Sequence, residues 1–248
     1  MTESVQPGTL YVVSTPIGNL GDISHRALHI LGSVDVIAAE DTRTSRVLLE
    51  HYTITTPLVS YFIQNELRRI PELVQRLAAG GSVAVISDAG TPGISDPAFA
   101  LVRAALQGGA QVVAVPGASA MLTALVASGL PTERFVFEGF LPHKKGRKTR
   151  IGQLVGETRT IVLYESPHRI ERTLTDLAEQ MGERRAVLAR ELTKKFEEMR
   201  RGTLQDLSDG VRTAPPRGEI VLIIEGCDRK QAAAHTADEG EERDTDHG

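Results

Sequence analysis

Short apolar runs alternate with segments of helical periodicity over residues 9–127. Runs such as Thr9–Ser14 and Val83–Ser87 are rich in Val, Leu and Ile, which is typical of strands buried on both faces of a sheet. Repeated strand–helix units predict a mostly parallel sheet with helices on both faces. The expected strands are Thr9–Ser14, Asp35–Ala39, Pro57–Tyr61, Val83–Ser87 and Gln111–Val115; the expected helices are Ser24–Leu31 (preceded by Asp22 as its cap), Thr42–Glu50, Glu66–Ala79, Ala98–Gln107 and Ser119–Ala127.

The second half of the chain has a different pattern. The segment Ser128–Glu133, SGLPTE, is polar and broken by Gly and Pro, and it predicts a domain boundary. Long strands that follow one another predict a mixed or largely antiparallel sheet. We therefore expect a two-domain α/β protein with a flexible start (1–8), an N-terminal domain (9–130), a C-terminal domain (131–227) and an acidic disordered tail (228–248). The expected strands are Arg134–Gly139, Thr160–Glu165, Arg185–Leu192, Glu197–Gly202 and Glu219–Glu225, with helices at Arg147–Val155, Pro167–Gln180 and Thr203–Asp209.

Composition narrows the class of protein. Hydrophobic residues make up 41% of the chain and aromatic residues only 4%, so the core is aliphatic. The single cysteine, Cys227, cannot form an internal disulfide and offers no cysteine-cluster metal site, which fits a reducing, cytoplasmic setting. We expect no metal, because the histidines lack ligand spacing. We also expect no membrane association, since neither a secretory signal nor an apolar run of membrane-spanning length is present.

Three expected strands run directly into loops rich in Gly, Pro and small residues. They are the segments Val12–Ser24, Ile86–Pro97 and Val112–Ala124. Ligands of parallel sheets bind beyond the carboxyl ends of strands, so the three loops together predict a small-molecule site, with Asp88–Pro97 as one wall. None contains a GxGxxG fingerprint or the lysine of a phosphate-binding loop. Ordinary tight turns and local helix capping are the alternative interpretation.

Charged side chains follow several of these strands. Glu40, Asp41 and Asp88 are candidate proton acceptors, and Arg43 is a candidate phosphate contact. Carboxylates at a helix N-terminus also have a purely structural explanation, because they interact favourably with the helix dipole. Which carboxylate acts as a base, and whether the reaction needs one, is left open by the residues alone.

The segment His143–Arg150, HKKGRKTR, is dense in Lys and Arg. The tail from Asp228 onward accounts for the whole net charge of −4, so the remaining chain is neutral and this basic segment stands out. It is either a solvated loop or a contact for nucleic-acid phosphates, and its density favours the second. The candidate RNA contacts are Arg43, Lys144, Lys145, Arg147, Lys148 and Arg150.

Six motifs occur together in a fixed order: TPIGNLGDI, AAEDTR, SDAGTPGISDP, PGASA, YESPHR and ARELTK. This set, which extends from about Thr9 to Cys227, resembles the 16S ribosomal RNA ribose 2′-O-methyltransferases of the tetrapyrrole-methylase superfamily. The resemblance implies a two-domain fold that binds S-adenosylmethionine in a cleft between the domains, usually as a homodimer. It also implies a substrate, a cytidine ribose in the decoding region of 16S ribosomal RNA within the small ribosomal subunit.

The resemblance also implies cofactor-binding residues. Relatives that methylate tetrapyrroles have an aspartate before the proline of the second loop, where this chain has Thr91. The implied residues are Pro16, Gly90, Thr91, Pro92, Ser95, Ser119, Ala120, Glu165 and Leu192.

Two alternatives stay open. A tetrapyrrole methyltransferase of the same fold would need a largely apolar pocket and few cations, so the basic segment argues against it. A non-catalytic RNA-binding protein of ribosome assembly would share the fold, and the intact cofactor loop argues against that.

Overall fold

The computed structural model describes residues 4–228. The chain divides into two compact units, Met1–Ser119 and Ala120–Gly248, called here the first and second units. Almost all of the predicted acidic tail, 228–248, and the first residues of the predicted flexible start, 1–8, lie outside the described residues.

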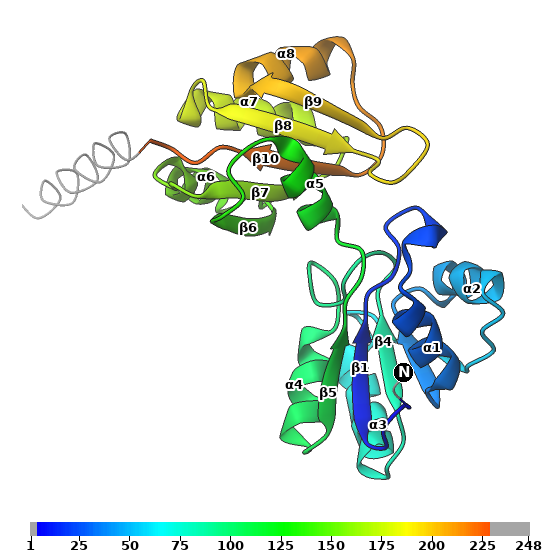
Figure 1. The fold of residues 1–248 in the computed structure, drawn as a ribbon. Helices are drawn as coiled ribbons and strands as arrows, with labels where there is room; N and C mark the ends of the chain where they lie inside the picture. Colours follow the sequence, from blue (N-terminus) through cyan, green and yellow to red (C-terminus); the bar gives the residue numbers. More distant parts are fainter. Residues whose placement is uncertain (1–3, 229–248) are drawn as a thin grey trace, which may run out of the picture. The chain divides into compact units, whose positions relative to one another are not determined.

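The first unit contains a five-stranded sheet in the order β3-β2-β4-β1-β5, in which every neighbouring pair is parallel (Figure 1). Parallel neighbours require crossover connections, and helices supply most of them. The elements are β1 (Thr9–Val13), the short 3₁₀ helix η1 (Leu20–Asp22), α1 (His25–Ser33), β2 (Val36–Ala39), α2 (Thr42–His51), β3 (Leu58–Ser60), α3 (Glu66–Ala78), β4 (Val83–Ile86), α4 (Phe99–Gln107) and β5 (Gln111–Val115).

Each face of the first sheet has its own apolar core. Successive side chains of a strand point to opposite faces. Tyr11 and Val13 therefore pack with residues of α1 and α2, whereas Leu10 packs with residues of α3 and α4. The strands are buried on both sides, as the aliphatic runs predicted.

The cap of α1 corrects a detail of the sequence analysis. Ser24, not Asp22, precedes the helix, and its hydroxyl accepts a hydrogen bond from Ala27 N at 3.1 Å. Asp22 instead belongs to η1, where the side chain of Asn19 accepts from Gly21 N. The expected cap was wrong because residues Leu20–Asp22 form a short 3₁₀ helix before α1, whereas the expected start at Ser24 lies within one residue of the observed one.

The second unit contains a mixed five-stranded sheet in the order β6-β7-β10-β8-β9. Only the β6–β7 pair is parallel; the other pairs are antiparallel. The predicted α/β class, with a parallel and a mixed sheet, is confirmed. The elements are α5 (Ala120–Ser128), β6 (Phe135–Phe140), α6 (Arg147–Val155), β7 (Thr160–Glu165), α7 (Ile170–Met181), β8 (Arg185–Arg190), β9 (Glu198–Thr203), α8 (Leu204–Thr213) and β10 (Ile220–Ile224).

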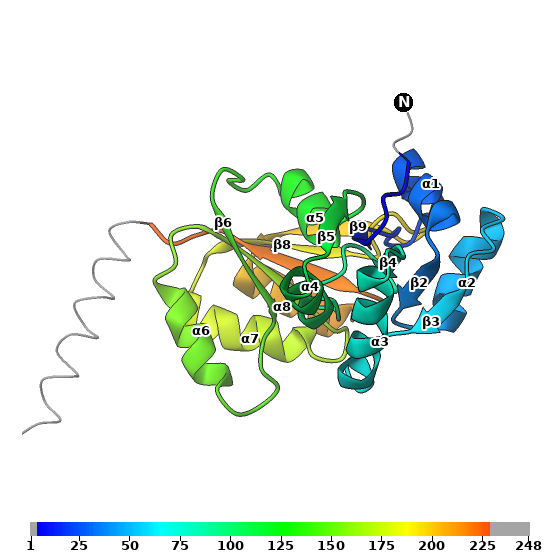
Figure 2. The ribbon, with the colours of Figure 1, turned by 90° about the horizontal axis from the view of Figure 1, so that it is seen from below.

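Helices cover the second sheet unequally. Residues of α6, α7 and α8 form one continuous core with Leu163, Leu188 and Leu222 of the sheet (Figure 2). The helix α5 packs against β7 and β10 and therefore belongs to this unit. The division between units accordingly falls one helix before the Gly- and Pro-broken segment 128–133, at which the sequence analysis placed its boundary.

Candidate functional site

The loop after β4 leaves the first sheet at a point where the connections from two neighbouring strands pass to opposite faces of the sheet. The chain from β1 passes to β2 by way of α1 on one face, and the chain from β4 passes to β5 by way of α4 on the other face. Because β1 and β4 are neighbours, their loops diverge beyond their carboxyl ends. Such a switch point is the usual ligand site of open α/β sheets. Residues 87–98 therefore occupy the position that favours ligand binding.

The loops after β1 and β4 are held together by a two-residue bridge. Thr15 N donates to Gly90 O at 2.8 Å, and Gly90 N donates to Thr15 O at 3.1 Å. The Thr15 hydroxyl also donates to Ser87 O at 3.2 Å. Gly90 has φ +77°, a conformation that side-chain-bearing residues rarely adopt. The bridge fixes the backbone next to Pro16, which is buried.

The loop after β5 joins the same cluster. The hydroxyls of Thr91 and Ser14 lie 2.9 Å apart, and the Thr91 hydroxyl also reaches Ala118 O at 3.4 Å. A Cβ atom at Gly117 would come within 2.9 Å of the Ser14 Cβ, so only glycine fits. Sequence reasoning did not single out Ser14 or Gly117. The Pro-Gly step after a strand was the signal for Gly117, and nothing local marks Ser14.

The second loop carries backbone strain as well as close contacts. Ser95 has φ +67°, and Gly93 has φ +88°. A positive φ at a non-glycine residue is uncommon, and such residues concentrate at functional sites. Pro92 is buried at the start of this turn. The structure thus brings Pro16, Gly90, Thr91, Pro92 and Ser95 into one loop cluster. Ser119 and Ala120 lie further along the chain, at the division between the units.

The three candidate bases also meet. Strands β2 and β4 are neighbours, so the residues that follow them are adjacent. Asp41 N donates to the Asp88 carboxylate at 3.0 Å, and Asp88 N donates to the Glu40 carboxylate at 3.4 Å. Asp41 caps α2 by accepting from Arg43 N at 2.8 Å, and it forms an ion pair with the exposed Arg43 guanidinium at 2.7 Å.

The three carboxyl groups have different environments, which shift their pKa values in different directions. Hydrogen bonds and charge from Arg43 lower the pKa of Asp41 to about 2. Partial burial raises the pKa of Glu40, and the negative charges of Asp88 and Asp41 add to the effect. Desolvation by its surroundings also raises the pKa of Asp88, with a contribution from Asp41, although its side chain reaches solvent. A raised pKa makes a carboxylate a better proton acceptor, so Glu40 and Asp88 suit that role and Asp41 does not.

Besides Ala120, two predicted cofactor residues, Glu165 and Leu192, lie in the second unit. The buried Glu165 carboxylate accepts from the Thr173 hydroxyl at 2.6 Å and from Ser166 N at 2.8 Å, and it pairs with Arg169 at 3.2 Å. These contacts make Glu165 an anchor between β7 and α7. Leu192 is buried between Glu191 and Thr193, whose φ values are +50° and +66°. The sequence analysis did not identify Thr193, whose buried hydroxyl makes no hydrogen bond within residues 4–228.

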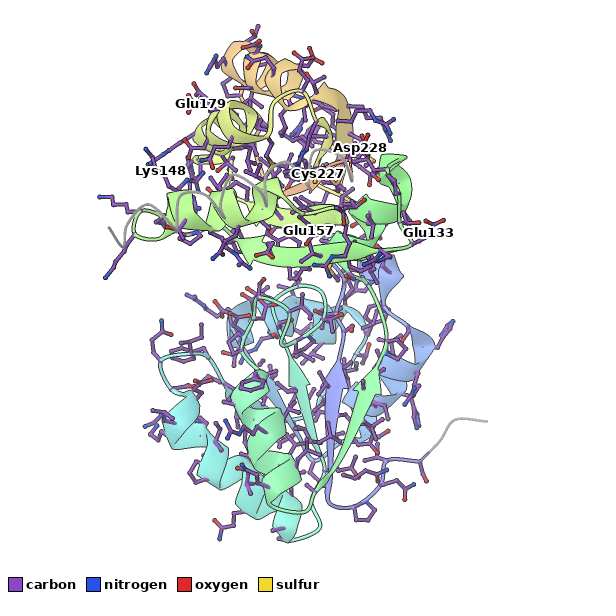
Figure 3. All side chains as sticks on the ribbon, turned by 90° about the vertical axis from the view of Figure 1, so that its left-hand side faces the viewer. Glu133, Lys148, Glu157, Glu179, Cys227 and Asp228 are labelled. Carbon is purple, nitrogen blue, oxygen red and sulfur yellow. The ribbon has the colours of Figure 1, made fainter. Side chains whose placement is uncertain are left out.

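The basic segment surrounds the first turn of α6. Lys144, Lys145 and Lys148 are exposed, and none of their side chains has a hydrogen bond or ion pair within the described part of the chain. Lys148 lies on α6 at the periphery of the second unit (Figure 3). Arg150 is half-exposed and bonds the Glu138 carboxylate at 2.8 Å through Nε.

Arg147 does not belong with these residues, and its predicted RNA contact is wrong. It is only 4% exposed. Its guanidinium donates to Asp176 at 2.7 Å, to the Thr173 hydroxyl at 2.9 Å and to Pro142 O at 3.2 Å. Thr173 in turn donates to Glu165, so the arginine completes a buried polar network. Arg147 belongs to a run of basic residues in the sequence, but its side chain points inward because this position of α6 faces the core.

Replacing Arg147 with methionine is expected to lower the free energy of unfolding by about 3 kcal/mol. Removal of one partner of a buried pair weakens the compensation of the other charge, and the loss lies at the low end of the usual range because Asp176 is partly exposed and keeps a longer ion pair with Arg172 at 3.7 Å. Lys148→Met, one position further along the same helix, should change stability by less than about 0.5 kcal/mol. Urea unfolding of both variants measures the difference; equal stabilities would contradict the structural role of Arg147.

Among residues 4–228, no cluster of three or more His, Cys, Asp and Glu side chains is arranged to hold a metal ion. No helix of the described residues has the length and apolar character needed to cross a membrane.

The fold and the loop cluster define a two-unit α/β protein with a ligand site of the switch-point kind in its first unit. Residues 9–208 match the family model of the tetrapyrrole (corrin/porphyrin) methylases, and the chain belongs to this family. The family membership expected from the motifs is thereby confirmed.

Two curated relatives share about half of their aligned residues with this chain. The chain is 51% identical to Ribosomal RNA small subunit methyltransferase I of Synechocystis sp., over 89% of this chain and 80% of the relative. It is also 51% identical to the protein of the same name in Xylella fastidiosa, over 93% of this chain and 86% of the relative.

Solved structures support the fold. Diphthine synthase aligns with a TM-score of 0.71 at 15% identity, covering 93% of this chain and 95% of that one. A uroporphyrin-III C-methyltransferase from Thermus thermophilus, complexed with S-adenosylhomocysteine, aligns with a TM-score of 0.62 at 19% identity, covering 88% of this chain and 97% of that one.

Proposed function

We propose that this methyltransferase transfers the methyl group of S-adenosylmethionine to the ribose 2′-hydroxyl of a cytidine in the decoding region of 16S ribosomal RNA. Identity of about half to the ribosomal RNA small subunit methyltransferases supports the RNA substrate. The structural observation that carries the proposal is the exposed lysine cluster at the start of α6, because a tetrapyrrole methyltransferase has no need of it.

The residues at the switch point fit a sulfonium cofactor. The segment 87–98 contains no Lys or Arg, and Asp88 and Glu40 add negative charge beside it. Carboxylates attract a cation, and the interlocked backbone leaves space only for small side chains. Pro16, Gly90, Thr91, Pro92 and Ser95 would hold the cofactor, which supplies an electrophilic methyl group when bound. Ser119, Ala120 and Leu192 complete the proposed set, with Glu165 in a supporting position.

Within this site we assign proton removal to Asp88. A ribose hydroxyl is a weak nucleophile, and a positioned base assists it by accepting its proton as the new carbon–oxygen bond forms. Asp88 combines a raised pKa with a solvent-reaching carboxylate, whereas Glu40 is more enclosed. The Asp41 N–H holds one Asp88 oxygen and leaves the other for substrate.

The lysine cluster has no stabilising explanation within its own helix. The N-terminal end of a helix carries partial positive charge, so cations there are unfavourable and anions favourable. The first turn of α6 has no acidic residue, and Gly146 at its start provides no side-chain cap. Lys144, Lys145 and Lys148 are therefore better explained as phosphate contacts than as helix stabilisers. Arg43 and Arg150 are weaker candidates, because each already bonds a carboxylate.

Homodimer formation and a cytoplasmic location are part of the same proposal. Sedimentation equilibrium of the purified chain tests the first, and cell fractionation tests the second.

The test of the proposed function uses small ribosomal subunits from cells that lack the gene, incubated with methyl-labelled S-adenosylmethionine. We expect label in a ribose-methylated cytidine of 16S ribosomal RNA, located by nuclease digestion and mass spectrometry. Label on a tetrapyrrole with none on RNA would refute the RNA substrate. Subunit binding without transfer would favour the non-catalytic alternative.

A further inference from the structure

A hollow of about 410 Å³ lies in the second unit between the end of β6 and the start of α6. Its apolar wall comes from Phe140, Leu141 and Pro142, and its polar wall comes from α6. The volume falls within the range of small-molecule sites. The residues that line the hollow belong to the second unit, whereas those of the switch-point cluster belong to the first.

A β-bulge in β6 adds one carboxylate to the polar side of the hollow. Phe137 pairs with Val162 and Gly139 pairs with Leu163, so Glu138 is the extra residue of β6. Bulges re-aim side chains at strand ends, and this one directs the Glu138 carboxylate to Arg150 on α6. Arg150 also donates to the Gln153 amide oxygen at 2.9 Å. The carboxylate, guanidinium and amide are thus ordered before any ligand arrives.

Phe140 supplies an exposed ring at this hollow. The side chain is 53% exposed, and it meets Tyr164 at a ring edge, with centroids 5.8 Å apart and planes at 61°. Hydrophobic residues exposed singly are ordinary, but this ring lines a hollow with polar groups fixed on its opposite side. Phe140 also lies only a few residues before Lys144, Lys145 and Lys148. The three lysines do not line the hollow, but Gly146, which separates them in the sequence, does. Exposed aromatic rings combined with cations bind single-stranded nucleic acid.

We infer that this hollow binds an unstacked nucleobase of the substrate RNA, with its face on Phe140 and its edge toward Gln153 and Arg150. Sequence-specific contacts to RNA target unpaired bases, which stack on aromatic rings and expose their edges to hydrogen-bonding groups. The lysines beside the hollow hold the adjoining phosphates. This inference rests on the proposed RNA substrate and adds to it a specificity site outside the reacting centre.

The test compares four variants of the full chain: Phe140→Ala, Phe140→Leu, Phe140→Tyr and Phe196→Ala. Phe196 is the matched control, since it is 62% exposed in the same unit but does not line the hollow. Loss of one stacked base predicts about 5- to 150-fold weaker binding of small subunits for Phe140→Ala, less loss for Phe140→Leu, and wild-type binding for Phe140→Tyr. Affinity for S-adenosylmethionine should be unchanged in all four variants. For Phe140→Ala, KM for subunits should rise while kcat does not fall.

The outcomes separate this inference from the function on which it rests. If wild type methylates 16S ribosomal RNA but Phe140→Ala binds subunits as tightly as Phe196→Ala, the nucleobase site is refuted and the function stands. If Phe140→Ala loses binding that Phe140→Tyr retains, the nucleobase site is supported even where no methyl transfer to RNA is detected. Equal binding by Phe140→Leu and wild type would also overturn the inference, because stacking needs the ring.

Discussion

Asp88→Asn is expected to lower kcat for methyl transfer by about 100-fold or more, the usual contribution of a general base. Asparagine keeps the shape of the side chain and the oxygen that accepts from Asp41 N, but it cannot take a proton. Affinity for S-adenosylmethionine should change much less than kcat. Single-turnover transfer to small subunits, with cofactor binding measured by calorimetry, separates the two quantities.

The pH profile gives a second readout for the same residue. The carboxylate acts only when ionised, so activity should fall as pH drops through the pKa of Asp88, which burial raises above its ordinary value. Asp88→Asn should remove this acid limb and leave a low, flat rate. Because a raised carboxyl pKa means that the folded state disfavours the charged form, Asp88 contributes less stability above its folded pKa than below it, and the variant should be no less stable at neutral pH.

Asp41→Asn is the matched control for this prediction. Asparagine caps helices about as well as aspartate, and Asp41, with a pKa of about 2, is a poor proton acceptor. Activity should stay within a few-fold of wild type. If Asp88→Asn instead weakens cofactor binding with little change in kcat, Asp88 binds the positively charged sulfonium of the cofactor. The assignment of Asp88 as the base is then wrong.

The strands of the first unit were predictable because burial on both faces leaves a plain sequence signal. Val83–Ile86 is aliphatic at every position, and its loop is rich in Gly, Pro and Asp. The strand–helix pattern predicted the α/β class and a small-molecule loop, and the family motifs added the superfamily and the expected cofactor. Which carboxylate suits proton transfer depended on neighbours far apart in sequence: Asp41 and Asp88 meet only because β2 and β4 pair.

The basic segment shows where sequence reasoning fails. In HKKGRKTR, Arg147 and Lys148 look equivalent, yet Arg147 is buried against Asp176 and Thr173 and Lys148 is exposed. The sequence analysis predicted the bounds of α6, Arg147–Val155, as the structure has them, but not which of its residues face the core, because that depends on Asp176 and Thr173 of α7. Ser14 could not be identified from the sequence either. It contacts Thr91 in the loop after β4 and Gly117 in the loop after β5, both far from it in the chain.

The triple variant Lys144→Ala/Lys145→Ala/Lys148→Ala is expected to weaken subunit binding by about 100-fold at 0.1 M salt. Each phosphate contact with single-stranded RNA contributes about 0.7 to the slope of log affinity against log salt, so three contacts lower that slope by about 2. Arg147 is left in place, because its loss would destabilise the unit. Filter binding of small subunits over a range of salt concentrations measures both quantities.

Stability should move in the opposite direction from affinity. Lys148 lies in the first turn of α6, and Lys144 and Lys145 lie just before it. Removing these cations relieves an unfavourable interaction with the helix dipole, so the triple variant should be at least as stable as wild type. The control Arg26→Ala/Arg68→Ala/Arg103→Ala removes the same charge from exposed positions of the first unit. If both triple variants lose affinity equally, the effect is one of net charge, and the lysines of α6 are not a specific contact. If only the lysine variant loses affinity for subunits, and it loses no stability, the three lysines serve RNA binding although they do not stabilise α6.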